Sequence, residues 1–253
     1  MIPQKKDLDY IKKYLPTNKL EEGISLLKKG ISPQYIVGNV DFYGNIIEVN
    51  PSVLIPRFET ELLVEKTIQY IHRLFPNIPT ENLQILDIGT GSGCIAIILK
   101  KELNSQITAI DISNKALEVA KKNALSNQVD IKFFSSDIFS NIQDKFDIII
   151  SNPPYIREDE EIEAIVKNNE PHLALYAEED GLYFYKKILS QASNYLKNKF
   201  LIAFEIGYQQ GDAITLLAYH YLKDVEVIVE KDYSNKDRFV FIFNKEDIKN
   251  ECQ

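Results

Sequence analysis

The sequence has little of what marks a disulfide-bonded, metal-clustered or membrane-spanning protein. Its two cysteines, Cys94 and Cys252, are too few for a disulfide framework or for a cysteine cluster around a metal. No apolar run approaches the roughly 18 to 20 residues that a helix needs to cross a bilayer. Charges interrupt every apolar stretch of the opening segment MIPQKKDLDYIKKYL, so no signal peptide is visible. We therefore expect a cytoplasmic protein with no metal site and no membrane contact.

Long basic stretches are also missing. The 253 residues include 37 acidic and 29 basic ones, which gives a formal net charge of −8, and no block of Lys and Arg is typical of a nucleic-acid-binding tail. This balance argues against stable nucleic-acid binding, although a local basic patch can oppose the net charge. With 45% hydrophobic and 26% charged residues, the chain has enough apolar material for one large domain, or for one large and one small domain.

Hydrophobic spacing divides the chain into three parts. Residues 1–30 have helical spacing and predict two short helices separated by the sequence PTN. Residues 31–79 predict a β-hairpin linker followed by a helix. In residues 80–253, short apolar strands alternate with helices, two of which we expect at 94–103 and near 114–123. This alternation predicts an α/β domain with a mostly parallel, doubly wound sheet.

The middle part carries local signals of its own. The stretch YIVGNVDFYGNIIEV alternates and is rich in β-forming residues, and Gly44-Asn45 is the expected hairpin turn. A helical pattern then runs from Thr60 to about Phe75, with acidic residues near its start. Thr60 is a candidate N-cap of this helix because its hydroxyl can accept a backbone hydrogen bond.

A glycine-rich turn follows the first strand of the third part, in LDIGTGSGCIAI. Gly89, Gly91 and Gly93 lie between a strand and a helix, which lets the backbone approach a ligand closely. Asp111 ends the next strand, where a carboxylate can accept hydrogen bonds from ribose hydroxyls. A dinucleotide fingerprint would place its third small residue where Cys94 stands, and no G-x-x-x-x-G-K phosphate loop is present. The turn therefore predicts a nucleotide-type ligand of another kind.

This D-x-G-x-G-x-G turn, with an acid after the next strand, resembles the Rossmann-like class of S-adenosylmethionine-dependent methyltransferases. The resemblance implies S-adenosylmethionine as the cofactor and S-adenosylhomocysteine as its product. It also implies that Asp87 meets the ammonium end of the cofactor, that Asp111 holds the ribose, and that Asp137 and Ile138 contact the adenine. A helix N-cap explains Asp137 about as well. The expected cofactor-binding residues are Asp87, Gly89, Thr90, Gly91, Ser92, Gly93, Asp111, Asp137, Ile138 and Asn152.

A second motif, NPPY, ends the apolar strand DIIIS. An amide nitrogen or an exocyclic amine is a poor nucleophile because its lone pair is delocalised into the neighbouring π system. The Asn152 side-chain oxygen and the Pro153 carbonyl can accept its two N–H bonds, while Pro154 stiffens the loop. Tyr155 offers a flat face on which a planar group can stack. These four catalytic candidates favour methyl transfer to a planar nitrogen, driven by positioning and electrostatics without a general base before attack.

The tetrapeptide alone does not identify the substrate, because methyltransferases of adenine, cytosine and glutamine share it. The segments VLIPRFETELLVE, SNPPYI, NEPHLALYAEEDGLYFYKKIL, EIGYQQGDAI and KDYSNKDRFV together resemble the release-factor glutamine methyltransferase family. This resemblance covers nearly the whole chain. It implies methylation of the glutamine side-chain nitrogen (N5) in the Gly-Gly-Gln motif of class I peptide chain release factors, which would be the partners of this protein. It also implies that Phe58 borders the substrate pocket, with Asn152, Pro153 and Tyr155 contacting the substrate.

The sequence also departs from that family and leaves alternatives open. Only residues 1–30 precede the matching region, whereas the family begins with a longer helical domain. His172 stands where the family usually has an arginine, beside Glu170 and Pro171, which are expected to start a loop that supports the site. Glu205, at the end of a predicted strand, is either an acid that supports the site or an ordinary end-of-strand charge. Amino-methylation of DNA or RNA bases and a non-catalytic binding module are the alternative functions.

Overall fold

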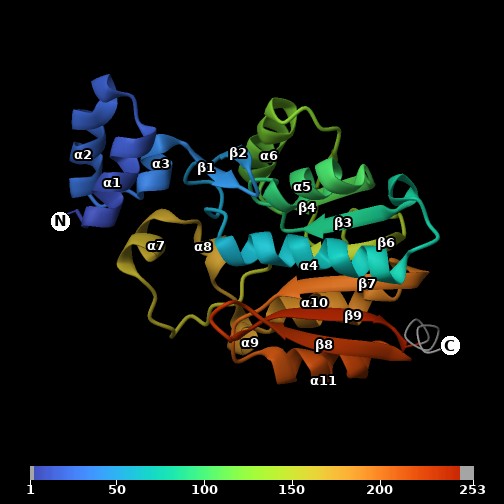
Figure 1. The fold of residues 1–253 in the computed structure, drawn as a ribbon. Helices are drawn as coiled ribbons and strands as arrows, with labels where there is room; N and C mark the ends of the chain where they lie inside the picture. Colours follow the sequence, from blue (N-terminus) through green and yellow to red (C-terminus); the bar gives the residue numbers. More distant parts are fainter. Residues whose placement is uncertain (1–2, 246–253) are drawn as a thin grey trace.

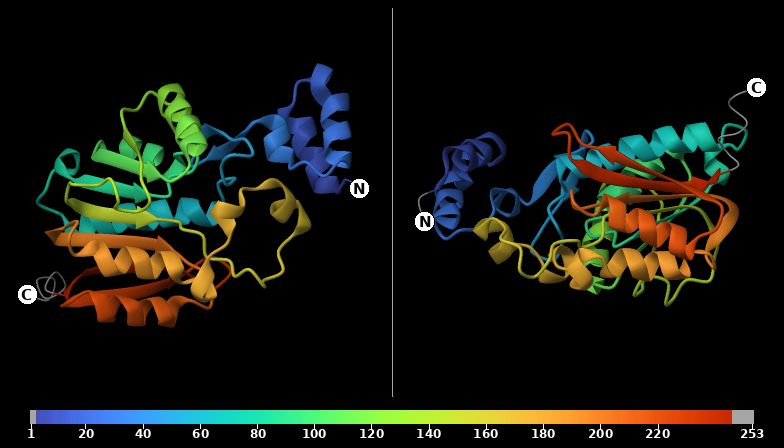
Figure 2. Two further views of the ribbon diagram at one scale, coloured as in Figure 1. Left: turned by 180° about the vertical axis from the view of Figure 1, so that it is seen from behind. Right: turned by 90° about the horizontal axis from the view of Figure 1, so that it is seen from below.

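A sheet covered by helices on both faces forms the larger part of the computed structural model, which describes residues 3–245 (Figures 1 and 2). Cys252 lies outside these residues. Within them, the larger sheet contains seven strands, in the spatial order β5-β4-β3-β6-β7-β9-β8. These strands are β3 (Gln84–Ile88), β4 (Gln106–Asp111), β5 (Lys132–Ser135), β6 (Phe146–Ser151), β7 (Leu196–Glu205), β8 (Val225–Lys231) and β9 (Asp237–Asn244).

Most of the described strand pairs are parallel. β3 pairs with β4 and β6, β4 with β5, and β6 with β7, all in parallel, whereas β9 runs antiparallel to both β7 and β8. Helices lie in the connections from β3 to β4, from β4 to β5 and from β6 to β7, whereas a loop without a helix connects β5 to β6. Every residue of β6 is buried, which explains why FDIIIS reads as a continuous apolar run rather than an alternating one. The predicted doubly wound, mostly parallel α/β fold is confirmed.

Two groups of helices bury the faces of this sheet (Figure 2). One apolar cluster joins the sheet to α4 (Phe58–Leu74), α5 (Cys94–Leu103) and α6 (Asn114–Ser126). The other cluster joins it to α10 (Tyr183–Ala192) and α11 (Gly211–Tyr221). The shorter helices are η2 (Thr80–Asn82), α7 (Ala164–Asn169), α8 (His172–Leu175) and α9 (Glu178–Gly181). The prediction of α5 is confirmed, and α6 runs slightly beyond its expected end.

The amino-terminal part forms a small helical group beside the sheet (Figure 1). It consists of α1 (Lys5–Tyr14), the 3₁₀ turn η1 (Thr17–Lys19), α2 (Leu20–Lys28) and α3 (Pro33–Val37). The two predicted helices are confirmed as α1 and α2. The third was missed because its residues carry β-forming side chains, yet Pro33 sits in the first turn, where its lack of an N–H group costs nothing. The expected strand character at residues 35–37 is therefore wrong.

The predicted hairpin exists, but its turn lies one residue earlier than expected. Strands β1 (Asn39–Phe42) and β2 (Asn45–Glu48) pair so that Phe42 faces Asn45, which leaves Tyr43 and Gly44 as the turn. Both turn residues have positive φ angles, 53° and 71°. Two such residues match the right-handed twist of the strands, whereas the predicted Gly44-Asn45 turn would shift their register.

Two adjacent side chains tie segments that precede α4 to the end of α7. The Asn169 Nδ2 atom donates to the Gly30 carbonyl at 2.8 Å, and its Oδ1 atom accepts from the Ser32 N–H at 3.2 Å. The neighbouring Glu170 carboxylate accepts from the Ile55 N–H at 3.1 Å and pairs with Arg57. The expected supporting role of Glu170 agrees with these contacts. In residues 3–245, no helix is long and apolar enough to cross a membrane.

Candidate active site

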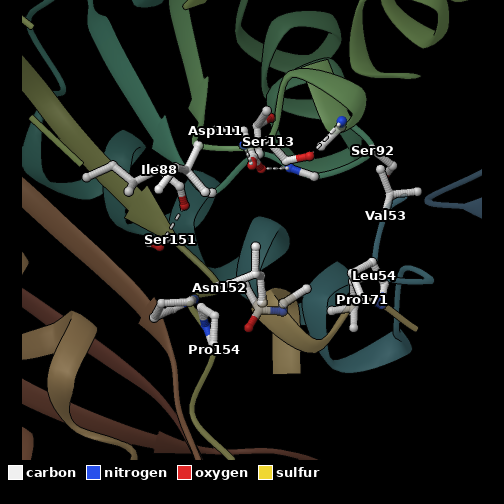
Figure 3. Close-up of a pocket in the computed structure, with 18 of the residues that line it drawn as sticks. Val53, Leu54, Ile88, Ser92, Asp111, Ser113, Ser151, Asn152, Pro154 and Pro171 are labelled. Atoms are coloured by element: carbon white, nitrogen blue, oxygen red, sulfur yellow. Dashed lines mark hydrogen bonds between the residues drawn. The ribbon is translucent and has the colours of Figure 1, made fainter. Parts of the chain in front are cut away.

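A cleft opens where the carboxyl ends of β3, β4 and β6 meet (Figure 3). The chain runs from β3 outward to β4 and β5 and then returns to β6 on the other side of β3, so the order of the sheet reverses here. Open α/β sheets bind ligands at such a reversal. The cavity volume is about 220 Å³. Ser151 closes its floor, since its hydroxyl donates to the Ile88 carbonyl at 2.7 Å and joins β6 to β3.

Most of the sequence-predicted cofactor and catalytic residues lie on this one cleft. Those that line it are Gly89, Thr90, Gly91, Ser92, Asp111, Asp137, Ile138, Asn152, Pro153 and Pro154. Four other candidates, Asp87, Gly93, Phe58 and Tyr155, are not among its described lining residues. The lining also includes Val53, Leu54 and Leu173, for which no role was predicted, and Pro171, which was expected to start a supporting loop; these residues add an apolar wall.

The glycine-rich turn adopts a conformation that side chains disfavour. Gly89, Gly91 and Gly93 have φ angles of +73°, +54° and +83°. A Cβ on Gly93 would approach Ala120 Cβ to 3.1 Å, so this glycine lets α5 and α6 pack closely. Asp111 holds the turn from the opposite side, because its carboxylate accepts from the Gly91 N–H at 2.9 Å. The turn is therefore shaped by backbone conformation and anchored by one acid.

Asp87 lies beneath the turn and is fully buried. Burial raises the pKa of this carboxyl to about 7, and the Thr90 hydroxyl and the Ala96 amide offset this only partly. The Thr90 Oγ1 atom donates to Asp87 Oδ2 at 2.6 Å, while Oδ1 accepts no hydrogen bond from the described residues. A buried acceptor without a donor fits a site that receives a cation close by.

The NPPY motif places its amide on the cleft and its phenol behind it. The Asn152 Nδ2 atom donates to Thr60 Oγ1 at 3.1 Å. The Tyr155 hydroxyl donates to Glu205 Oε1 at 3.5 Å. Burial raises the pKa of Tyr155 well above its ordinary value, so the phenol keeps its proton. Tyr155 therefore supports the site through Glu205, and its predicted stacking on the substrate stays a prediction.

Thr60 and Glu205 are the residues whose roles the sequence pattern did not reveal. Thr60 is not an N-cap: α4 begins at Phe58, and Arg57, in an extended conformation (φ −104°, ψ 157°), occupies the cap position. The Thr60 hydroxyl instead donates to Glu205 Oε2 at 2.8 Å. Glu205 is only 1% exposed, and burial raises its pKa to about 7. In the sequence, the only indication of this role of Glu205 was a single acidic residue at the end of an apolar strand.

Three further candidates, Asp137, Phe58 and His172, contact neighbouring side chains that the sequence did not predict. Asp137 lines the cleft but forms an ion pair with Lys187 at 2.7 Å, and it lies in a turn rather than at the N-cap of a helix, so that alternative is wrong. Phe58 is 58% exposed and stacks on Tyr233 with a centroid separation of 5.9 Å. His172 packs against the Tyr176 ring at 4.4 Å. Among the described residues, no group of three or more His, Cys, Asp or Glu side chains is arranged to hold a metal ion.

The fold and a domain family agree on the class of protein. The family model described as Methyltransferase small domain matches residues 69–176. The crystal structure of a methyltransferase from Pyrococcus furiosus is similar in fold, with a TM-score of 0.57 and 20% identity over 80% of this chain and 90% of that one. Together with the glycine-rich turn and the NPPY motif, these matches define a Rossmann-like methyltransferase.

Closer relatives identify the family. The chain is 46% identical over 217 residues to the release factor glutamine methyltransferase of Streptococcus pneumoniae, which covers 85% of this chain and 75% of that protein. It is 43% identical over 226 residues to the enzyme of the same name from Lactococcus lactis, with 88% and 81% covered. The chain belongs to the release factor glutamine methyltransferase family, which confirms the resemblance seen in the sequence.

Proposed function

We propose that this protein transfers the methyl group of S-adenosylmethionine to the side-chain nitrogen N5 of the glutamine in the Gly-Gly-Gln motif of class I peptide chain release factors. Membership of the family supports this substrate. The observation that carries the chemistry is the position of Asn152, whose side-chain amide lies on the same cleft as the glycine-rich turn. A planar nitrogen held by Asn152 would therefore sit beside the bound cofactor.

The residues of the turn suit this cofactor. When bound, S-adenosylmethionine supplies an electrophilic methyl group on a positively charged sulfur. Asp87 lies beneath the turn, and its Oδ1 atom accepts no hydrogen bond from the described residues, so once ionised this carboxyl would stabilise the ammonium end of the cofactor. Asp111 is already held by the Gly91 and Ser113 N–H groups, so its remaining lone pairs can accept ribose hydroxyls. Asp137 and Ile138 form the far wall, where the adenine would lie.

The catalytic contribution of the chain is to orient the acceptor. A glutamine amide has two N–H bonds, and the Asn152 Oδ1 atom and the Pro153 carbonyl can accept one each. Accepting both bonds directs the nitrogen lone pair along the line of attack and raises its electron density. Pro153 and Pro154 lack N–H groups and have restricted φ angles, which keeps the carbonyl groups of this loop fixed. The nitrogen loses its proton to solvent only after methylation.

Charge in the loop after Tyr155 disfavours the alternative substrate, a nucleic-acid base. The loop that follows Tyr155 contains Glu158, Asp159, Glu160 and Glu161, all exposed. Arg157 pairs with Asp159, which leaves three carboxylates of this loop that would repel a phosphate backbone and attract basic groups on a protein partner. The intact cofactor turn and NPPY motif likewise disfavour a purely non-catalytic binding module.

The test is a methyl-transfer assay on intact release factor. Purified protein and S-adenosylmethionine are incubated with a class I release factor, and intact mass followed by peptide mapping locates any added methyl group. We expect one added methyl on the Gly-Gly-Gln glutamine, and none on a control factor in which that glutamine is replaced by glutamate. An unchanged factor mass while the cofactor is demonstrably bound, or methylation of oligonucleotides instead, would overturn the proposal.

A further inference from the structure

Three side chains from distant parts of the chain form a continuous hydrogen-bonded relay that runs from the wall of the cleft, at Asn152 and Thr60, to Glu205. Glu205 ends β7, Thr60 lies in the first turn of α4, and Asn152 follows β6. The Thr60 Oγ1 atom donates to Glu205 Oε2 at 2.8 Å and accepts from Asn152 Nδ2 at 3.1 Å. Glu205 and Thr60 are 145 residues apart in the sequence, and both are buried. The relay ends at the residue that would hold the substrate nitrogen.

A count of protons fixes the direction of this relay. A carboxylate only accepts hydrogen bonds, so the single proton of the Thr60 hydroxyl is committed to Glu205. The Thr60 oxygen can then only accept, and the group that faces it must be the NH₂ end of the Asn152 amide. With the amide reversed, Asn152 Oδ1 would face the Thr60 oxygen with no proton between them, at the cost of a buried unsatisfied acceptor. The Oδ1 atom is thus turned away from Thr60.

We propose that Glu205, acting through the Thr60 hydroxyl, is the positioning group that keeps Asn152 Oδ1 directed at the substrate nitrogen. This inference rests on the proposed function for its substrate, but the relay itself is a property of the free protein. Thr60 lines the cleft and Glu205 does not, but in this role both act on the substrate only through the Asn152 amide. They act by excluding the reversed Asn152 amide. In that orientation the NH₂ group of Asn152 would face the NH₂ group of the substrate glutamine, and no hydrogen bond could form between them.

The relay has a condition: Glu205 must be ionised. A protonated Glu205 could donate to Thr60, which would release the Thr60 proton and allow the reversed Asn152 amide. The charged and titratable groups that interact with Glu205 come from α4, α5, the loop after β6, α10 and β9, and are Glu59, Cys94, Tyr155, Tyr185 and Arg238. Arg238 and the Thr60 and Tyr155 hydroxyls lower the Glu205 pKa, while burial and Glu59 raise it, and burial dominates.

The first test reads the Asn152 amide directly and needs no substrate. In protein labelled with ¹⁵N-asparagine, the Nδ2 resonances of Asn152 are assigned by their absence from an Asn152→Ala sample. We expect hydrogen exchange of these protons to be about tenfold faster in Thr60→Val, which keeps the side-chain shape but removes the acceptor. Thr67→Val is the matched control, since Thr67 is a buried threonine of the same helix whose hydroxyl donates to the Leu63 carbonyl.

The second test uses kinetics at saturating cofactor and substrate. We expect Thr60→Val to lower kcat about tenfold or more while Thr60→Ser restores most of it, because serine keeps the hydroxyl. For the wild type, kcat should fall about tenfold from pH 8 to pH 6 as Glu205 takes up a proton. Glu205→Gln cannot ionise, so its kcat should vary little over this range. Thr67→Val should behave as the wild type.

The outcomes separate the two proposals. If the wild type methylates no release factor, the proposed function fails, and the Asn152 resonances still decide whether the relay exists. If exchange at Asn152 is the same in the wild type, Thr60→Val and Glu205→Gln, the relay is wrong even though methylation proceeds. A Glu205→Gln enzyme that keeps the wild-type fall in kcat at low pH would also overturn it. If Thr60→Val folds poorly, two other variants still test the relay: Glu205→Gln preserves the side-chain volume, and Thr60→Ser preserves the hydroxyl.

Discussion

Gly181 lies directly against the main-chain carbonyl of Tyr155. A Cβ at position 181 would overlap the Tyr155 oxygen and crowd Gln210 Nε2, which itself donates to that oxygen at 3.1 Å. Gly181 also has a φ angle of +81°, which side chains disfavour. The end of the NPPY motif is thus supported by a glycine of α9 and an amide of the loop before α11.

Gly181→Ala should therefore destabilise the fold and slow the enzyme. We expect a loss of about 3 kcal/mol in the free energy of unfolding, because strain at positive φ adds to the overlap with Tyr155. Gly44→Ala is the matched control, since Gly44 also has positive φ (+71°) but open space around the added Cβ; it should lose only about 1 kcal/mol. Urea unfolding and methyl-transfer rates measure both variants. Equal losses would contradict this account of Gly181.

Asn152→Ala should abolish turnover and leave cofactor affinity nearly unchanged. The substitution removes an acceptor for the substrate nitrogen, and loss of such a group costs about 10²- to 10³-fold in kcat. The turn that carries the cofactor residues is held by Asp111 rather than by Asn152, so it should stay intact. Calorimetry with the cofactor and a steady-state assay separate the two effects. A wild-type rate would refute the role of Asn152 as a clamp.

Asp111→Ala should weaken cofactor binding by about 1–3 kcal/mol, because it removes a partner of buried hydroxyls and frees the Gly91 N–H. Asp137→Ala is the contrasting variant, and we expect it to lose less cofactor affinity than Asp111→Ala, because the Asp137 carboxylate is partly exposed and already paired with Lys187. Equilibrium titration with S-adenosylmethionine gives both affinities. If the Asp137 variant loses more affinity than the Asp111 variant, the positions assigned to the ribose and the adenine of the cofactor are wrong.

Asp87 should make the protein less stable as pH rises. Its folded pKa of about 7 lies above the ordinary value of 3.8, so the folded protein binds the proton more tightly than the unfolded chain does. The stability that protonation contributes is complete below pH 3.8 and is lost as pH rises to about 7, by up to about 1.4 kcal/mol per pH unit.

Asp87→Asn tests this linkage because asparagine mimics the neutral acid. Its unfolding free energy should fall less steeply between about pH 4.5 and 7 than that of the wild type. Some slope should remain, since Glu205 has a raised pKa of the same sign. Urea unfolding at several pH values gives both slopes. Identical slopes would mean that Asp87 is not the buried acid that titrates.

The relation between sequence and structure is clearest in the hairpin and in α3. Tyr35, Ile36 and Val37 favour strands as isolated residues, yet they form a helix because α3 packs against α1 and α2. Likewise, alternation places a turn near Gly44 but cannot choose between two registers. The register is the one in which Phe42 pairs with Asn45, which makes Tyr43 and Gly44 the turn. Local preference is overruled wherever burial against another element is worth more.

The sequence alone predicts the motifs whose residues are contiguous in the chain. Glycines at alternating positions after a buried strand specify a turn, and an amide followed by two prolines specifies a rigid loop with exposed acceptors. Both motifs follow apolar strands, and parallel strands end at the same edge, so their meeting on one cleft was predictable. The helix of α5 and the parallel sheet followed from the same periodicity.

Tertiary structure alone decided which side chains stand behind those motifs. The sequence marked Thr60 as a candidate cap and left Glu205 as either a supporting acid or a strand-end charge. The hydrogen bond of 2.8 Å between these two buried side chains favours the supporting acid. The exposure of Phe58 and the ion pair of Asp137 were equally invisible in the sequence. Short-range geometry is encoded in neighbouring residues, whereas hydrogen bonds across the core depend on how helices and strands pack, which no local pattern records.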